Sequence, residues 1–559
     1  MRSRALPTRD MQGHCMYVDS LPENAQFDYV VVGAGSSGCV LANRLSADGR
    51  HEVLLVEAGR RDKHVNIHVP MFVARVLMDE RFTWPFKTEP QVHLNGKPQL
   101  WVRGRVIGGS SSINGNLFVR GDPKEYDKWR ASGCEGWGWT DLLPYFKRLE
   151  DFPEGDPQIR GRGGPIGVTR LHKFDELADA FIAACEQNGH PFLNDYNDGS
   201  YEGTFYLQYS TRRGLRSSAA VGYLRPAMKR RNLSVITEAT ATRLVMNGRR
   251  AGGIEISHHG KLQTITARRE VILSAGPLKS PQLLELSGIG NADMLRQHGI
   301  DVLHHLPGVG ENLRDHPNVR VTYECTKPLT VNDVLRSPLL RIREGMRFVF
   351  TRKGFLAICS STAQTNLRSD AHAEQPDLVV RLMPVSGKDR YARTKKYGLD
   401  PWSGFSIGIT PLQPRSTGSV HIRSRDPDEQ PSMDPRYLSH EADVQLFLDG
   451  IRRARAIAEQ PAMKALIVRE TRPGPTVTDT GALLDYVREG INTSWHMVGT
   501  CKMGVDDTAV VDPQLRVRGI ENLRVADSSI CPTIPSSNTN AAAIAIGEKA
   551  SDMILQAAR

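Results

Sequence analysis

The chain has 559 residues, of which 40% are hydrophobic and 24% charged, and its 72 Lys and Arg residues exceed its 62 Asp and Glu residues to give a net charge of +10. This composition is ordinary for a globular protein and argues against a disordered chain, a collagen-like repeat or a coiled coil. No apolar run approaches the ~18–20 residues that a membrane span requires. The basic surplus is spread along the chain without a long basic block, so we expect no nucleic-acid partner.

The N-terminal residues and the cysteines bear on the compartment. Residues 1–26 lack the apolar stretch of a secretory signal, which predicts an N-terminal extension outside the fold. The eight cysteines form no CxxC pair and no cluster with histidines at the spacing of metal ligands. We therefore expect no metal site, no disulfide framework and a reducing, cytoplasmic compartment.

A strand–helix–strand unit follows the extension. The β-branched run Tyr29–Val32 predicts a buried strand, the amphipathic stretch Cys39–Leu45 a helix, and the apolar run Val53–Val56 a second strand. A Gly-x-Gly-x-x-Gly motif at residues 33–38 joins the first strand to the helix, and Glu57 follows the second strand. An acid about 20 residues after this motif is typical of a dinucleotide-binding βαβ unit, where it accepts hydrogen bonds from ribose hydroxyls.

The three glycines have separate roles in such a unit. Gly33 allows the tight turn, Gly35 lets the backbone approach a pyrophosphate, and Gly38 lets the helix pack closely on the strand. Ser36 and Ser37 lie at the N-terminus of the helix, whose free N–H groups suit phosphates. The motif predicts nucleotide binding but does not separate NAD from FAD.

A second polar segment, residues 103–121, reads RGRVIGGSSSINGNLFVRG. Its backbone N–H groups, its hydroxyls and its flanking arginines suit an anionic cofactor; the alternative is a flexible surface loop. Residues 233–245 and 270–274 are expected to be strands, and residues 274–290 (SAGPLKSPQLLELSGIG) a strand end, a turn and a short helix.

The later part of the chain differs in pattern. Residues 320–493 mix strand-like runs at 404–409 and 418–422 with a helical run at 441–459. This middle block is a candidate substrate domain. The chain then closes with the segments WHMVGTCKMG and LRVADSSICPTIPSSNTNAAAIAIGE.

Four of these segments together resemble the signatures of the glucose–methanol–choline (GMC) flavin oxidoreductase family. The loop at 103–121 is similar to the first signature, and SAGPLKSPQLLELSGIG to the second. WHMVGTCKMG is similar to the catalytic histidine segment, and SSNTNAAAIAIGE to the closing flavin-contact segment. The resemblance runs from about residue 27 to the C-terminus, and within the family the chain looks most like bacterial choline, alcohol and sorbose dehydrogenases.

The resemblance implies an α/β fold with two parts. A Rossmann-like FAD-binding domain is expected from the discontinuous segments 27–172, 216–319 and 494–559. An interleaved sheet-and-helix substrate domain is expected from residues 173–215 and 320–493.

The resemblance also implies the reaction, in which an alcohol is oxidised to an aldehyde or ketone by hydride transfer to flavin N5. His496 matches the catalytic histidine, and a His pKa near ~6.5 suits a general base. The second active-site position matches Asn540, whose amide can hydrogen-bond the substrate oxygen but cannot take its proton. The alternative for Asn540 is an N-cap residue of an Ala-rich helix. The positive end of that helix, at Asn540 and Ala541, would face the negative edge of reduced flavin.

Other positions match the family's cofactor contacts. Asp527 matches an acid near the phosphate–ribityl region, the backbone at Ala241 should touch the adenine, and Trp495 could wall the pocket. Ile113 stands where some relatives carry a flavin-linking His, so we expect dissociable FAD. The remaining predicted contacts are Gly109, Ser110, Asn114, Gly115, Asn116, Leu117 and Asn538.

The sequence says little about the substrate or the electron acceptor. Choline needs a carboxylate or an aromatic cage, and nothing in residues 320–493 marks one, so a non-ionic primary alcohol or polyol is the favoured class. The acceptor could be a quinone, another carrier or O2; resemblance to quinone-linked members favours a dehydrogenase, with an oxidase or a non-redox lyase as alternatives. Peripheral contact with the inner face of a membrane is compatible with the sequence, and the oligomeric state stays open.

Overall fold

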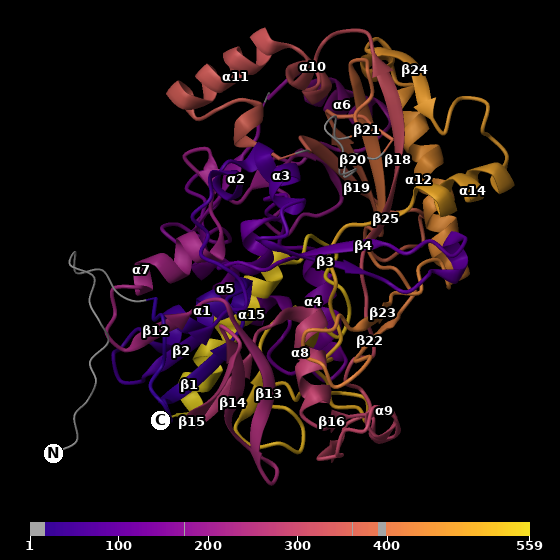
Figure 1. The fold of residues 1–559 in the computed structure, drawn as a ribbon. Helices are drawn as coiled ribbons and strands as arrows, with labels where there is room; N and C mark the ends of the chain where they lie inside the picture. Colours follow the sequence, from indigo (N-terminus) through magenta and orange to yellow (C-terminus); the bar gives the residue numbers. More distant parts are fainter. Residues whose placement is uncertain (1–16, 173, 360, 389–397, 559) are drawn as a thin grey trace.

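The computed structural model describes residues 17–172, 174–359, 361–388 and 398–558, so most of the predicted N-terminal extension lies outside the described residues. Two β-sheets, each with its own apolar core, form the two ends of the molecule (Figure 1). The hairpin of β3 (Thr83–Lys87) and β4 (Leu100–Gly104) crosses between them.

The first sheet contains the predicted nucleotide-binding unit. Its strand order within the described residues is β12-β2-β1-β15-β14-β13, with β26 beside β15. β12, β2, β1, β15 and β26 pair in parallel, whereas β13, β14 and β15 form an antiparallel meander. The strands are β1 (Gln26–Val32), β2 (Val53–Val56), β12 (Leu233–Ile236), β13 (Ala239–Asn247), β14 (Arg250–His258), β15 (Lys261–Leu273) and β26 (Leu523–Val525).

The parallel strands are buried on both faces, which explains their continuous apolar runs. All four residues of β2 are buried. Helix α1 (Ser36–Leu45) packs on β1 and β2 and against α15 (Asn540–Ala557), so the two ends of the chain share one core. The strands and helix expected around the glycine motif are confirmed.

The second sheet is antiparallel and has the order β24-β18-β21-β20-β19-β8 in the described part of the chain, with β25 on β18. Helix α12 (Glu441–Ala458) packs on β20 and β21, and α6 (Glu176–Gln187) packs on β8 and β19. The strands are β8 (Gly203–Tyr206), β18 (Pro317–Cys325), β19 (Ala363–Leu367), β20 (Leu378–Met383), β21 (Gly404–Pro411), β24 (Ile467–Arg472) and β25 (Asn492–Thr493). The strand at 404–409 and the helix at 441–459 are confirmed.

The two sheets agree with the expected two-part α/β organisation. Phe86 and Trp101 of the β3–β4 hairpin pack into the second core, although the predicted boundaries assign them to the first part. The domain boundaries themselves stay a proposal.

The remaining elements connect these layers. The helices are α2 (Val65–His68), α3 (Val73–Leu77), α4 (Pro123–Ala131), α5 (Trp139–Leu149), α7 (Arg225–Ala227), α8 (Gly276–Leu286), α9 (Ala292–Gln297), α10 (Val331–Arg336), α11 (Pro338–Thr351), α13 (Pro461–Lys464) and α14 (Thr480–Gly490). The short strands are β5 (Glu150–Asp151), β6 (Ile166–Gly167), β7 (Thr169–Arg170), β9 (Gln208–Tyr209), β10 (Thr211–Arg212), β11 (Leu215–Arg216), β16 (Ile289–Gly290), β17 (His304–His305), β22 (Ser419–His421) and β23 (Ser432–Asp434).

Three further findings concern the described residues. Cysteines 39, 134, 185, 325, 359, 501 and 531 are buried and free. Among these residues we find no helix that is long and apolar enough to cross a membrane. In the same part of the chain, no three His, Cys, Asp or Glu side chains gather as a metal-binding group.

Candidate active site

A cavity of about 680 Å³ lies between the two sheets and is lined by residues from many separate segments. It contains most of the positions predicted from the sequence. Those that line it are Gly33, Gly35, Ser36, Ser37, Glu57, Gly109, Ser110, Asn114, Gly115, Asn116, Leu117, Ala241, Trp495, His496, Asp527, Asn538 and Asn540.

Two predicted cofactor residues do not line the cavity. A Cβ on Gly38 would lie 1.9 Å from the carbonyl oxygen of Gly33, so this glycine permits the turn to close on α1. Ala541 is buried in the first core, one residue beyond the cavity wall. Gly38 and Ala541 therefore support the cavity wall by packing behind it and do not line the cavity.

The glycine turn and the loop at 103–121 form one backbone cradle. A Cβ on Gly109 would lie 2.7 Å from Cα of Gly35, and the N–H of Gly108 donates to the Ala34 carbonyl at 2.7 Å. Gly35 is the N-cap residue of α1 and offers no side-chain cap. The N–H groups of the first turn of α1 therefore face a space in which an anion can approach them.

Glu57 lies beside this cradle at the end of β2. Its carboxylate accepts hydrogen bonds from the backbone N–H groups of Ala34 and Gly59, each at 2.8 Å. Burial nevertheless raises the pKa of Glu57 to about 7, because desolvation outweighs those two donors.

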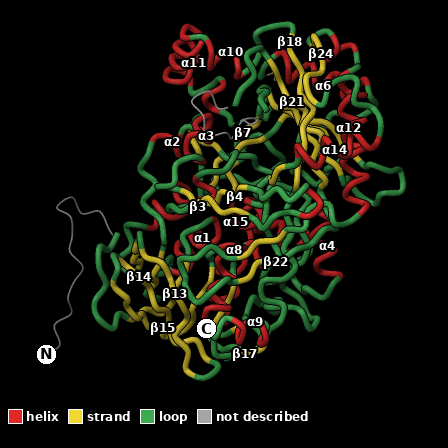
Figure 2. The backbone as a smooth tube through the Cα atoms, turned by 45° about the vertical axis from the view of Figure 1, so that its right-hand side comes forward, coloured by secondary structure: helices red, strands yellow, loops and turns green. Residues whose placement is uncertain are grey.

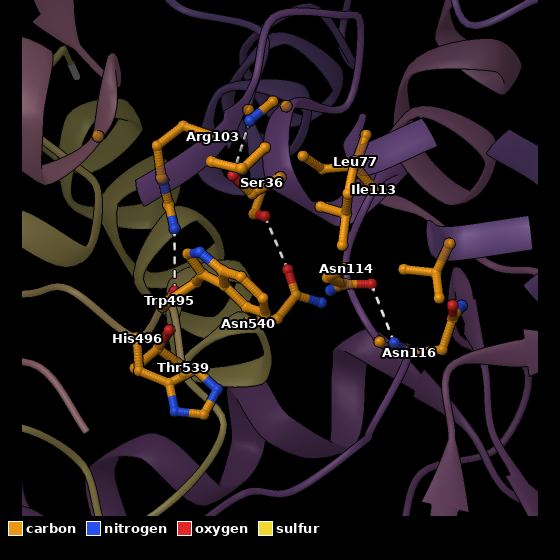
Figure 3. Close-up of a pocket in the computed structure, with 18 of the residues that line it drawn as sticks. Ser36, Leu77, Arg103, Ile113, Asn114, Asn116, Trp495, His496, Thr539 and Asn540 are labelled. Atoms are coloured by element: carbon orange, nitrogen blue, oxygen red, sulfur yellow. Dashed lines mark hydrogen bonds between the residues drawn. The ribbon is translucent and has the colours of Figure 1, made fainter. Parts of the chain in front are cut away.

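The loop residues Asn114 and Asn116 are held by the protein rather than being free in a surface loop. Asn114 Oδ1 accepts from the Asn116 N–H at 3.1 Å (Figure 3) and from buried Arg216 at 2.7 Å. Asn116 has a φ of 61° and its amide donates to the Ser210 carbonyl. The Arg216 anchor thus fixes the segment that lines the cavity.

Asp527 connects three segments around the cavity. Its carboxylate accepts from the Gly276 N–H at 2.9 Å, from the Ser280 hydroxyl at 2.6 Å and from the Ser529 N–H at 2.8 Å. The second sequence signature, which forms α8, is joined in this way to the closing segment.

The N-terminus of α15 also borders the cavity. The helix begins at Asn540 with Thr539 as its N-cap residue, so the alternative of Asn540 as an N-cap is wrong. The Ser36 hydroxyl donates to Asn540 Oδ1 at 2.8 Å (Figure 3). The positive ends of α1 and α15 therefore meet at one wall of the cavity.

His496 also lines the cavity and is linked to a second histidine. Its Nδ1 is 3.0 Å from Nδ1 of His316, and His316 Nε2 is 2.8 Å from the carbonyl oxygen of Leu412. A carbonyl can only accept, so His316 Nε2 carries the hydrogen. Burial lowers the pKa of His316 to about 4, so this ring is neutral and its Nδ1 accepts.

The consequence for His496 is a defined tautomer. Its Nδ1 must donate to His316, which leaves Nε2 as the nitrogen that accepts. Burial first, and then the neighbouring His316, Arg381 and Arg103 side chains, hold the pKa of His496 well below its usual value. The imidazole is therefore neutral near pH 7 and can accept a proton at Nε2.

Asn538, rather than Asn540, contacts this nitrogen. The Asn538 amide Nδ2 lies 2.9 Å from His496 Nε2, and its Oδ1 accepts from Arg381 at 3.4 Å, which fixes the orientation of the amide. Asn540 instead bonds to Ser36. The expected pairing of His496 with Asn540 is thus corrected: the two asparagines lie two residues apart, and the turn before α15 directs only Asn538 toward the base.

The backbone at His496 is held from both sides. The Asp315 carboxylate accepts from the His496 N–H at 2.7 Å and from the Thr493 hydroxyl at 2.6 Å. Trp495 has a φ of 60°, and its carbonyl accepts from Arg103 at 3.0 Å (Figure 3). These contacts aim the imidazole into the cavity.

Sequence reasoning missed Asp315, His316 and Arg381. The first two are adjacent in GVGENLRDHPN, just before β18, and two titratable residues at the start of a buried strand are a usable signal. Arg381 lies within the apolar strand β20, where a lone cation is unusual.

Comparisons with known proteins agree with this site. GMC oxidoreductase family profiles match residues 27–318 and 414–547. Oxygen-dependent choline dehydrogenase from Photobacterium profundum is 40% identical over 536 residues, covering 95% of this chain and 93% of that protein. The corresponding protein of Brucella anthropi is 40% identical, covering 94% and 95%.

Solved structures are similar over the same extent. Pyridoxine 4-oxidase from Mesorbium loti has a TM-score of 0.85 and 31% identity, covering 94% of this chain and 98% of that one. Formate oxidase has a TM-score of 0.89 and 27% identity, covering 96% and 99%. The chain therefore belongs to the GMC oxidoreductase family.

Proposed function

We propose that His496 takes the hydroxyl proton of a small uncharged alcohol bound in the cavity. The protein is an FAD-dependent oxidoreductase that oxidises a CH–OH group, as its family and relatives show. The observation that carries the proposed mechanism is the His316–His496–Asn538 chain of hydrogen bonds, which leaves one nitrogen of a neutral imidazole facing an amide donor.

The chain's own residues would handle the alcohol as follows. An alcohol hydroxyl that donates to His496 Nε2 would displace the Asn538 N–H from that nitrogen, and the alcohol oxygen would then accept from the same amide. As the proton moves to His496, the oxygen gains alkoxide character, which weakens the neighbouring C–H bond. Bound FAD supplies the acceptor for the hydrogen and two electrons that leave the carbon.

The residues around the rest of the cavity fit FAD. The cradle of Gly35 and Gly109 has room for a pyrophosphate beside free N–H groups. Glu57 would hold ribose hydroxyls, and Ala241 lines the same end of the cavity. The N-terminus of α15, which Ser36 joins to this cradle, would stabilise negative charge on the flavin ring.

The affinity for FAD is expected to depend on pH through Glu57. Ribose hydroxyls donate to the ionised carboxylate, so FAD prefers the deprotonated form. Because the pKa of Glu57 in the free protein is raised to about 7, lowering the pH below that value should weaken FAD binding by up to about tenfold per pH unit. Titration of the apoprotein by flavin fluorescence between about pH 5.5 and 8 measures this.

The matched variant for that experiment is Glu57→Gln. It should bind FAD more weakly and lose the pH dependence, since the amide does not titrate. A wild-type affinity that stays constant across the range would contradict the proposed role of Glu57.

FAD is expected to leave the polypeptide on denaturation. Ile113 lines the cavity, is 2% exposed and offers no nucleophile to the flavin. Acid or heat precipitation should therefore release free FAD into the supernatant, where its absorbance is read. Yellow colour that stays with the washed precipitate would show a covalent link.

His316 is proposed as a positioning residue that fixes the tautomer of His496. His316→Leu removes the acceptor at Nδ1, so the rate of flavin reduction by an alcohol should fall by about tenfold or more, as a fraction of the ~10²–10⁴ that general-base catalysis supplies. Stopped-flow absorbance under anaerobic conditions measures the rate.

His316→Gln provides the matched control. Its amide can donate to Leu412 and accept from His496, so it should restore much of the rate that His316→Leu loses. Equal rates in both variants, at wild-type FAD content, would remove the tautomer from the mechanism.

The cavity lining supports an uncharged substrate over choline. Lining residues include the cations Arg75, Arg103, Lys279, Arg320, Arg341 and Arg381. Trp84 already has Arg105 and Lys279 within 4.2 and 5.1 Å of its ring, so this aromatic surface is occupied by the protein's own cations. These cations outnumber the lining acids Glu57, Glu344 and Asp527, so a quaternary ammonium would meet net repulsion here.

A panel of alcohols under anaerobic conditions tests this class. We expect primary alkanols, polyols or pyridoxine to reduce the flavin, and choline to do so poorly. Faster reduction by choline than by every neutral alcohol would contradict the uncharged class while leaving alcohol oxidation intact.

We propose a dehydrogenase that passes electrons to a quinone or another carrier. The similar proteins carry names of both kinds, oxygen-dependent dehydrogenase and oxidase. The rates at which O2 and a quinone analogue reoxidise the reduced enzyme distinguish a dehydrogenase from an oxidase. A lyase would leave the flavin oxidised after turnover.

A further inference from the structure

Helix α11 turns an apolar face toward solvent. Leu339 and Phe350 are 79% and 82% exposed, and Ile342, Met346 and Val349 are also exposed. Spacings of three, four, three and one residues place these five side chains, here called the α11 apolar face, on one side of the helix. Exposed apolar side chains that gather in this way mark an interaction surface.

The other side of α11 faces the protein. Glu344 and Phe348 are buried, and the helix packs on α10 and on the turn at Phe355–Ala357. Both views show α11 at the outer edge of the molecule, beyond the second sheet (Figures 1 and 2). The α11 apolar face therefore points away from the protein core and into solvent.

Positive charge surrounds this face. Residues 335–353 contain six Lys or Arg and a single acid, Glu344, which is buried within 3.7 and 3.8 Å of Arg343 and Arg347. Arg343 and Arg347 follow the edge of the apolar face along the helix, and Arg352 and Lys353 extend the positive charge past its C-terminal end. All four are exposed. An apolar face bordered by cations is typical of a helix that lies in the surface of an anionic membrane.

We propose that α11 docks the protein on an anionic lipid bilayer, with its apolar face at the acyl boundary and its cations among the phosphate headgroups. Leu335, Arg341 and Gly345 of α10 and α11 also line the cavity. Docking would hold that side of the cavity close to the lipid. The proposal stands apart from the proposed reaction, because binding to vesicles is measured without substrate.

The test is cosedimentation of the holoenzyme with vesicles of phosphatidylcholine alone or mixed with phosphatidylglycerol. Wild type should bind the mixed vesicles, bind phosphatidylcholine weakly, and dissociate as salt is raised. The variant Ile342→Ser/Met346→Ser/Phe350→Ser should lower binding to mixed vesicles by roughly tenfold or more, and Arg343→Gln/Arg347→Gln should reduce it and flatten the salt dependence.

The matched control replaces exposed apolar residues elsewhere, Val92→Ser/Leu262→Ser/Val468→Ser, which should bind as wild type does. FAD content shows that each variant is folded. Absence of wild-type binding, or equal binding by the apolar-face variant, would overturn the proposal. So would a change of molar mass in that variant, which would show that the face joins two copies of the chain.

Discussion

His496→Ala is expected to slow flavin reduction by an alcohol by about 10²–10⁴-fold, the contribution of a general base. The variant should still bind FAD, because the hydrogen bonds of His496 go to Asp315, His316 and Asn538 and none goes to the glycine cradle or Glu57. Anaerobic stopped-flow absorbance gives the rate, and the flavin-to-protein absorbance ratio gives the cofactor content.

Three further variants serve as comparisons for that measurement. His93→Ala changes an exposed histidine and should leave the rate unchanged. Asn538→Ala removes the amide that faces His496 Nε2 and should lower the rate, whereas Asn540→Ala, which loses a bond to Ser36, should act mainly on FAD affinity. Unchanged reduction in His496→Ala would remove this residue from the mechanism.

Gly38→Ala and Gly35→Ala are expected to weaken FAD binding for different reasons. The Cβ that Gly38→Ala introduces would lie 1.9 Å from the Gly33 carbonyl oxygen, so the turn and α1 must separate. Overpacking of this kind costs about 1–3 kcal/mol or more. The melting temperature of the apoprotein should fall clearly.

At Gly35 the nearest protein atom to a new Cβ is 3.8 Å away, the carbonyl oxygen of Ser274, and φ is −74°. Gly35→Ala should therefore melt like wild-type apoprotein, within about 0.5 kcal/mol. Its methyl group would occupy the space where a pyrophosphate approaches, so FAD affinity should drop. Gly38→Ala that binds FAD and melts as wild type would contradict the packing account.

Single strands and helices of this fold could be predicted from the sequence because the residues that determine each of them are neighbours in the chain. The strand at Val53–Val56 follows from an apolar run, and the helix that begins at Asn540 follows from an Ala-rich stretch. Within the glycine motif the steric need is local at Gly38, whose Cβ would meet the Gly33 carbonyl, whereas a Cβ on Gly33 would meet the carbonyl oxygen of the distant Ser274 at 2.5 Å.

The surroundings of His496 could not be predicted in this way, since they depend on distant segments. His316 directly precedes β18 of the second sheet, Leu412 follows β21, and Arg381 lies on β20. The choice between Asn538 and Asn540 depends on one turn of backbone before α15, which no periodicity describes. The motif favours Asn540, and only the fold directs Asn538 to the imidazole.

The most direct measurement of the central claim is an anaerobic single turnover of the wild-type holoenzyme with a primary alcohol and with the same alcohol deuterated at its α-carbon. We predict that flavin absorbance is lost, that one aldehyde forms per flavin, and that the deuterated alcohol reacts more slowly. A flavin that stays oxidised with every alcohol, or that bleaches without forming a carbonyl product, would contradict it.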